Sequence, residues 1–119
     1  LRDAAMLGQI GADDAAAVPA AQAIHMATAG GADALGLPGG RLKEGATADL
    51  IVVDLASPHL TPTHNVISHL AYAARGSDVR HTICDGTVLM QNREIQTIDA
   101  ETVINTAETQ AQSLIERMG

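Results

Sequence analysis

The stretch from Gly39 to Leu55, GGRLKEGATADLIVVDL, decides how the rest of the chain is interpreted. Its first half contains glycines at 39, 40 and 45, and glycine adopts positive φ values without the steric cost that a Cβ atom brings. Its second half, residues 48–55, holds the branched apolar run LIVV between two aspartates, which predicts a β-strand. Because consecutive positions in this run are apolar, we expect both faces of the strand to be covered.

Helical patterns precede this stretch. Residues 1–10 predict a helix with a face of small residues suited to close packing. Pro19 fits the first turn of a second helix that runs to about Thr28, and a short third helix is expected over residues 32–35. Glycines 30 and 31 are predicted to interrupt the helical pattern between the two, and Gly36 to end the third helix.

The segment after the strand begins with a proline-containing loop over residues 57–63. It continues with a helix over 65–74, for which Asn65 or Thr63 is the expected N-cap. Residues 79–90 alternate around Asp85-Gly86, a strong signal for a β-hairpin, and a further short strand is expected at 95–98.

The chain ends in a clear amphipathic pattern. Asp99 is the expected N-cap of a helix from Ala100 to about Met118, whose apolar residues recur at intervals of three and four. The sequence as a whole therefore predicts a mixed α/β fold.

Composition limits the classes of function. The chain has 119 residues and is 46% hydrophobic, so it should fold, but it contains no Phe or Trp and one Tyr. So thin a core, and a first residue that is not Met, lead us to expect a piece of a larger unit. The net charge of −7 argues against a nucleic-acid partner and against a polybasic membrane patch. The single cysteine, Cys84, favours a reduced, cytoplasmic setting.

The glycine-rich turn followed by Ala48-Asp49-Leu50-Ile51-Val52-Val53-Asp54 resembles the C-terminal signature of the amidohydrolase superfamily. The resemblance implies a C-terminal fragment of a metal-dependent hydrolase. Its expected parts are the closing helices of a truncated (β/α)8 barrel (1–38), a glycine-rich crossover and sandwich strand (39–60), a loop and connecting helix (61–78), a hairpin of a small β-sandwich (79–98) and a C-terminal amphipathic helix (99–119).

Two further motifs, SPHLTP at 57–62 and AYAARGSDV at 71–79, resemble the 5-methylthioadenosine/S-adenosylhomocysteine deaminase branch of that superfamily. The branch implies hydrolytic deamination of a purine nucleoside by a metal-activated water, with zinc or another divalent metal in the intact parent. The family's metal ligands precede the segment that matches Leu1. We therefore expect no catalytic and no metal-binding residue and no cofactor in this chain, and its substrate-binding residues stay unassigned.

Histidines are the first candidates for a metal site that this resemblance would miss. No two of them have the spacing His-x-His or His-x-x-x-His, and His64 and His69 lie about 140° apart around a helix. We therefore predict surface or packing roles for all five, which are His25, His59, His64, His69 and His81.

Other candidates also have simpler interpretations. Asp78 ends a Gly-Ser-Asp sequence similar to the family's metal-binding Gly-Thr-Asp, but it follows the predicted strand instead of preceding it, so we predict a turn role. Asp49 and Asp54 flank the strand and are expected in turns or caps. Cys84 is expected to be a small buried hydrophobe. The Gly-Gly pairs at 30–31 and 39–40 match no phosphate-binding loop.

Two alternatives remain open at this point. The chain could be a non-catalytic module that self-associates or binds a partner through exposed apolar faces. It could also be the tail of another branch, such as a chlorohydrolase or a guanine deaminase. Self-association is expected for a deaminase fragment as well.

Overall fold

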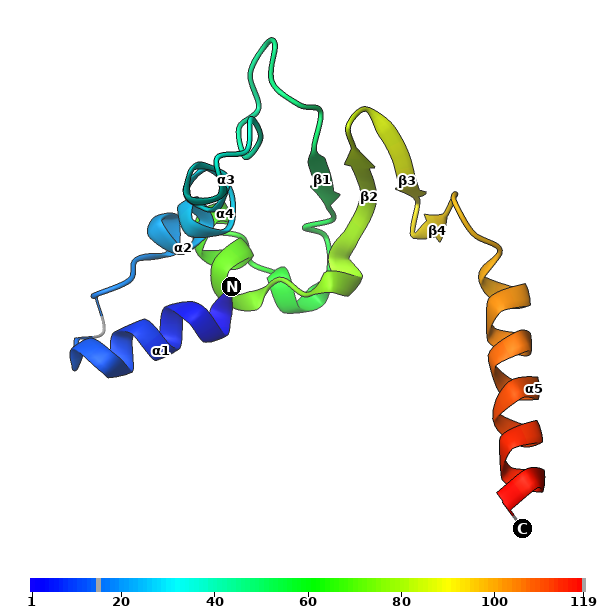
Figure 1. The fold of residues 1–119 in the computed structure, drawn as a ribbon. Helices are drawn as coiled ribbons and strands as arrows, with labels where there is room; N and C mark the ends of the chain where they lie inside the picture. Colours follow the sequence, from blue (N-terminus) through cyan, green and yellow to red (C-terminus); the bar gives the residue numbers. More distant parts are fainter. Residues whose placement is uncertain (15, 119) are drawn as a thin grey trace.

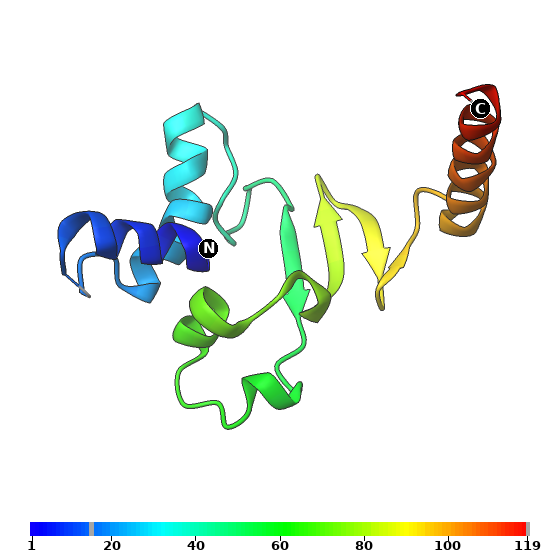
Figure 2. The same ribbon diagram turned by 90° about the horizontal axis from the view of Figure 1, so that it is seen from below.

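The computed structural model describes residues 1–14 and 16–118, and it contains three separate regions (Figure 1). A cluster of short helices lies on one side, a four-stranded sheet lies beside it, and one long helix projects beyond the sheet. The view from below shows the same separation (Figure 2). The mixed α/β class is confirmed.

The first helices are α1 (Arg2–Ala12), α2 (Ala20–Ala27) and α3 (Ala29–Leu35). Small residues bring them close to their neighbours, as the sequence predicts for residues 1–10. Ala5 has no exposed surface, and a Cβ atom at Gly8 would come within 2.6 Å of Val18 Cγ2. Close packing here therefore depends on the absence of larger side chains.

The break between α2 and α3 lies at Thr28, so the predicted interruption at Gly30-Gly31 is wrong. Thr28 has φ −125° and ψ −103°, whereas both glycines lie inside α3. A Cβ atom at Gly30 would lie 3.1 Å from the carbonyl oxygen of His25, and one at Gly31 would lie 2.9 Å from that of Met26. These glycines therefore allow α3 to approach the end of α2, which is a tertiary demand that helix propensity does not show.

The sheet is antiparallel, in the order β1 (Leu50–Val53), β2 (Val79–Cys84), β3 (Thr87–Gln91) and β4 (Glu94–Ile95). The hairpin predicted at Asp85-Gly86 is present, with positive φ at both turn residues. A second turn with positive φ at Asn92 and Arg93 moves the last strand from the predicted 95–98 to Glu94–Ile95.

Strand β1 forms one edge of the sheet, and the prediction that both of its faces are covered is wrong for this chain. Ile51 and Val52 are 57% and 45% exposed. The apolar run is typical of a strand covered on both faces, and the described residues do not provide that cover.

Between β1 and β2 the chain forms η1 (Pro58–Leu60), α4 (Val66–Ser68), η2 (His69–Ala73) and η3 (Gly76–Asp78). The helix predicted over 65–74 is present, but its second part, η2, is a π-helix. Asn65 caps it as predicted, because its Oδ1 accepts a hydrogen bond from the Ser68 N–H at 3.0 Å. Leu60 has the largest side chain that is fully buried among the described residues.

Helix α5 (Ala100–Met118) begins as predicted at Asp99, whose Oδ1 accepts the Thr102 N–H at 3.1 Å. None of its residues is buried, and both views show it away from the other elements (Figures 1 and 2). The radius of gyration is 18.9 Å, whereas a compact chain of this length would have roughly 13.5 Å. Among the described residues, no helix has both the length and the apolar composition needed to cross a membrane.

Candidate functional site

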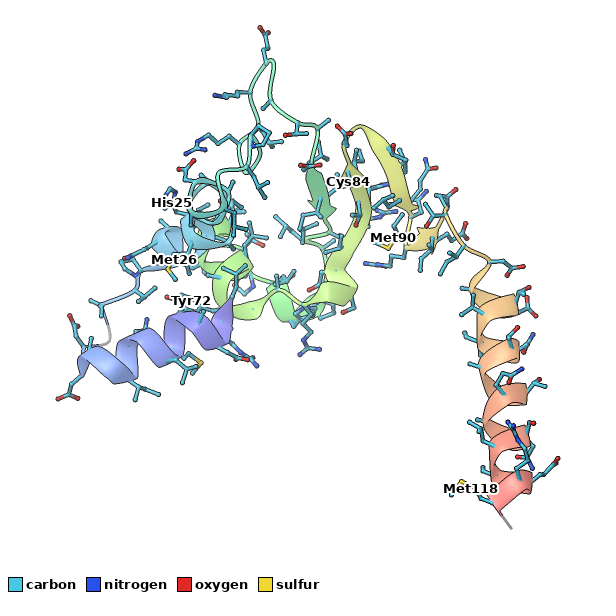
Figure 3. All side chains as sticks on the ribbon, viewed as in Figure 1. His25, Met26, Tyr72, Cys84, Met90 and Met118 are labelled. Atoms are coloured by element: carbon cyan, nitrogen blue, oxygen red, sulfur yellow. The ribbon has the colours of Figure 1, made fainter. Side chains whose placement is uncertain are left out.

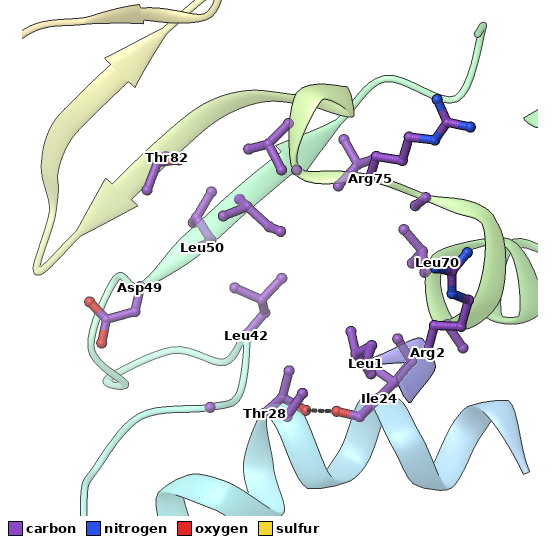
Figure 4. Close-up of a pocket in the computed structure, with 18 of the residues that line it drawn as sticks. Leu1, Arg2, Ile24, Thr28, Leu42, Asp49, Leu50, Leu70, Arg75 and Thr82 are labelled. Atoms are coloured by element: carbon purple, nitrogen blue, oxygen red, sulfur yellow. Dashed lines mark hydrogen bonds between the residues drawn. The ribbon is translucent and has the colours of Figure 1, made fainter. Parts of the chain in front are cut away.

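A hollow of about 1250 Å³ lies between the helical cluster and the sheet (Figure 4). The start of α1, the end of α2, the loop at 40–42, strands β1 and β2, and η2 form its walls. Its lining is mainly aliphatic and includes Leu1, Ile24, Leu42, Leu50, Ile51 and Leu70. This large, mainly apolar hollow is the candidate site.

The helical wall of the hollow is joined to α1 by the chain's single aromatic residue. The Tyr72 hydroxyl donates to the carbonyl oxygen of Val18 at 3.4 Å, and the Gln9 amide donates to the Tyr72 oxygen at 3.5 Å. Figure 3 shows Tyr72 directed toward α1. These long hydrogen bonds fix the direction of η2 more than they add stability.

The loop that enters the hollow depends on Gly40. Its φ is +78°, and a Cβ atom there would lie 2.6 Å from the carbonyl oxygen of Thr28. The next residue, Arg41, donates to both carboxylate oxygens of Asp33 on α3. This hydrogen bonding, together with the positive charge, lowers the pKa of Asp33. The loop is therefore held against the junction of α2 and α3.

The polar rim of the hollow contains Asp49, which Figure 4 shows, and Cys84. Asp49 Oδ1 accepts the Asp85 N–H at 2.7 Å, which fastens the hairpin turn to the start of β1. Cys84 is exposed at the end of β2, where it lines the hollow, so the predicted buried role is wrong. A hydrogen bond to Asp49 and the charge of that carboxylate raise the pKa of the Cys84 thiol. A thiol in this environment is not an activated nucleophile.

The second polar cluster surrounds Asp78, which is only 3% exposed. Its Oδ2 accepts the Arg75 N–H at 2.8 Å and lies 2.9 Å from His59 Nε2, and its Oδ1 accepts the Ser57 hydroxyl at 3.4 Å. The bond from the Arg75 N–H and that from His59 lower the pKa of Asp78 against the opposing effect of burial. Because Ser57 donates to the carboxylate and not to the imidazole, the cluster lacks the relay of a nucleophilic serine.

The sequence predicted the turn role of Asp78 but missed its pairing with His59. The turn role is present, because the carboxylate accepts the Arg75 N–H three residues earlier. The pairing arises because β1 and β2 are neighbours: the Asp54 N–H donates to the Asp78 carbonyl oxygen at 2.8 Å, which brings the segment after β1 to the start of β2. Only the strand pairing, which single-residue signals do not give, brings His59 to Asp78.

The remaining predicted residues do not assemble into a metal centre. His25 is exposed on α2, His64 lies in an exposed loop, His81 is on β2, and His69 Nδ1 donates to the Asn65 carbonyl oxygen at 2.8 Å. Asp54 accepts the Ala56 N–H at 3.0 Å and lies within 4 Å of Arg80 and Arg93. Within residues 1–14 and 16–118, no three His, Cys, Asp or Glu side chains form a group that could hold a metal ion. The donor set described for this chain does not fit a resident metal.

Comparison with known proteins gives the context of this piece. Residues 1–89 match the model of the amidohydrolase family. The chain is 87% identical over 118 residues to the 5-methylthioadenosine/S-adenosylhomocysteine deaminase of Haloquadratum walsbyi. This match covers 99% of this chain and 27% of that protein. It is 49% identical over 117 residues to the 5′-deoxyadenosine deaminase of Methanosarcina acetivorans, again 27% of that protein.

Solved structures give the same result. An adenosine deaminase from Xanthomonas campestris with bound zinc superposes with a TM-score of 0.88 and 34% identity, over 97% of this chain and 27% of that one. An atrazine chlorohydrolase from Arthrobacter aurescens complexed with zinc superposes with a TM-score of 0.69 and 26% identity, over 77% and 20% of the two chains.

The chain thus spans about a quarter of the length of the relatives it matches. The resemblance of the glycine-rich turn and strand to the amidohydrolase signature is confirmed, and it extends from the first helix to the hairpin. The chain belongs to the amidohydrolase family.

Proposed function

We propose that this chain is the C-terminal part of a metal-dependent deaminase that acts on an adenosine derivative, with its catalytic residues outside these 119 residues. The observation that carries the proposal is the 87% identity, over nearly the whole chain, to a 5-methylthioadenosine/S-adenosylhomocysteine deaminase. The superposition on a zinc-bound adenosine deaminase supports it. A reducing compartment such as the cytoplasm suits the single cysteine.

Deamination replaces the exocyclic amino group of the purine with oxygen from water and releases ammonia. A divalent metal in the longer enzyme would supply the activated water. The residues of this chain have a supporting role: residues 1–38 would be closing helices of the barrel, and the strand and hairpin would belong to the small sandwich. The Gly40 loop lies against the junction of α2 and α3, and the Asp78 cluster holds the segment after β1 to the start of β2.

A chimaera tests the proposal. The matching segment of the Haloquadratum walsbyi deaminase is replaced by residues 1–119, and ammonia release is measured with 5-methylthioadenosine, S-adenosylhomocysteine and 5′-deoxyadenosine. We expect turnover of at least one adenine nucleoside. A folded chimaera that releases no ammonia from any of them would reject the proposal.

A second candidate is a non-catalytic module that binds a partner or itself. It is favoured by the exposed apolar residues around the hollow, of which Leu42 is 80% and Ile51 57% exposed. Sedimentation of the isolated chain tests the self-associating form of this module. The module predicts a stable oligomer whose mass does not depend on dilution. A folded monomer would reject it.

A further inference from the structure

Helix α5 carries an apolar stripe along its whole length. At 100° per residue, the apolar positions fall within an arc of about 120°. The opposite side carries Asn105, Thr109 and Glu116. The stripe consists of Val103, Ile104, Ala107, Ala111, Leu114, Ile115 and Met118. Such a stripe is the pattern of a helix that packs against another surface.

Nothing among the described residues covers the stripe. Val103, Ile104, Leu114 and Ile115 are 51%, 57%, 53% and 63% exposed, and no residue from Ala100 to Met118 is buried. In Figure 3, Met118 lies at the far end of α5, away from Tyr72 and Cys84. In proteins, most of the stability of a helix comes from packing of its amphipathic face, so α5 needs a surface to pack against.

The match to the solved adenosine deaminase from Xanthomonas campestris extends into α5. The superposition has a TM-score of 0.88 and includes 97% of this chain. Helix α5 has 19 residues, which is more than the superposition leaves out, so most of α5 is included. Most of α5 therefore has a counterpart in a chain of which the matched part is only 27%. The larger part of that chain lies outside the match and offers a surface that could cover the stripe.

We propose that the apolar stripe of α5 docks on the part of the deaminase chain that lies outside this match. The proposal rests on the proposed function for the identity of that partner. In this arrangement the rest of the enzyme covers the apolar stripe. Helix α5 then connects the small sheet to the larger remainder of the enzyme. The docking also accounts for the extended shape, with a radius of gyration of 18.9 Å, because the chain would lie along the surface of the rest of the deaminase.

Hydrogen exchange measured by mass spectrometry tests this docking. The amides of α5 are compared in the isolated 119-residue chain and in the chimaera. We expect exchange roughly 100-fold slower in the chimaera, because docking closes the local openings that fray an isolated helix. The unaltered Haloquadratum walsbyi deaminase is measured in parallel, so the comparison holds even where the chimaera folds poorly.

Two matched variants of the chimaera identify the face that docks. Ile104→Asp places a charge on the stripe, and Thr109→Asp places the same charge on the opposite side. Ile and Thr have similar helix propensities, and position 104 is nearer the helix N-terminus, where a negative charge is favourable. We therefore expect Ile104→Asp to remove most of the slow exchange and Thr109→Asp to retain it.

Equal exchange of α5 in the isolated chain and in the full-length proteins would overturn the proposal. So would slow exchange in the isolated chain that strengthens with concentration, since it would assign the stripe to a second copy. Slow exchange in a chimaera that releases no ammonia would leave the docking intact and reject the deaminase proposal. Rapid exchange in a chimaera that does release ammonia would reject the docking alone.

Discussion

The carboxylate of Asp78 accepts hydrogen bonds from the Arg75 N–H, the His59 ring and the Ser57 hydroxyl, so it holds the 57–60 segment against the start of β2. These bonds lower its folded pKa below the ordinary value of 3.8. A carboxyl group with a lowered pKa contributes stability that is present above its unfolded pKa. That contribution is lost as the pH falls through the folded pKa.

Replacing Asp78 with Asn therefore tests a charge and an acceptor together. We expect Asp78→Asn to lower the free energy of unfolding of the isolated chain at pH 7, with a smaller difference from the wild type at pH 3, as measured by urea titration. The exposed Glu44→Gln is the control and should change little at either pH. Equal stability of Asp78→Asn and the wild type at pH 7 would contradict this role.

Leu60 provides the corresponding test of packing, because its side chain is fully buried. Leu60→Ala should lower the free energy of unfolding of the isolated chain by about 2–5 kcal/mol. Leu42→Ala removes the same atoms from a side chain that is 80% exposed and should cost far less. Similar losses for the two variants, measured by urea unfolding, would show that Leu60 is not part of the core.

The loop between α3 and β1 depends on glycine for two reasons that can be separated. Gly40 and Gly45 both have φ +78°, but only Gly40 lies against another segment, since a Cβ atom there would be 2.6 Å from the Thr28 carbonyl oxygen. Gly45→Ala should cost about 1–2 kcal/mol from the left-handed backbone alone. Gly40→Ala should cost more, because it adds a clash with the junction of α2 and α3. Equal losses in thermal unfolding would exclude the close contact.

Elements with local signals could be predicted from the sequence, and those set by distant contacts could not. The hairpin at Asp85-Gly86 and the caps Asn65 and Asp99 follow from the chemistry of a few neighbouring residues. The break at Thr28 was missed because the glycines that suggested it, 30 and 31, serve the packing of α3 on α2. The sequence does not predict the exposure of Ile51 and Cys84, because the burial of a strand residue depends on the segments packed against it and not on the strand itself.

The chain as a unit has little core of its own. Among the described residues, the fully or nearly buried apolar side chains are those of four alanines and Leu60. The radius of gyration exceeds that of a compact domain of equal length. Both features agree with a match to 27% of the length of its relatives. The composition, with a single aromatic residue in 119, agrees with so small a core.

The proposed placement of the metal ligands outside this chain predicts the metal content of the isolated chain. No group of metal ligands is present among residues 1–14 and 16–118. The isolated chain, purified with added zinc and then dialysed, should retain far less than one zinc per chain, as measured by inductively coupled plasma mass spectrometry. The chimaera should retain stoichiometric metal. One tightly held zinc in the isolated chain would contradict the placement of the metal outside it.

The most direct measurement is ammonia release from 5-methylthioadenosine by the isolated chain and by the chimaera under the same conditions. We predict turnover by the chimaera and none above background by the isolated chain, because the proposed function gives this piece a supporting role and places the catalytic residues outside it. Turnover by the isolated chain, or a folded, metal-loaded chimaera with no turnover, would contradict that account.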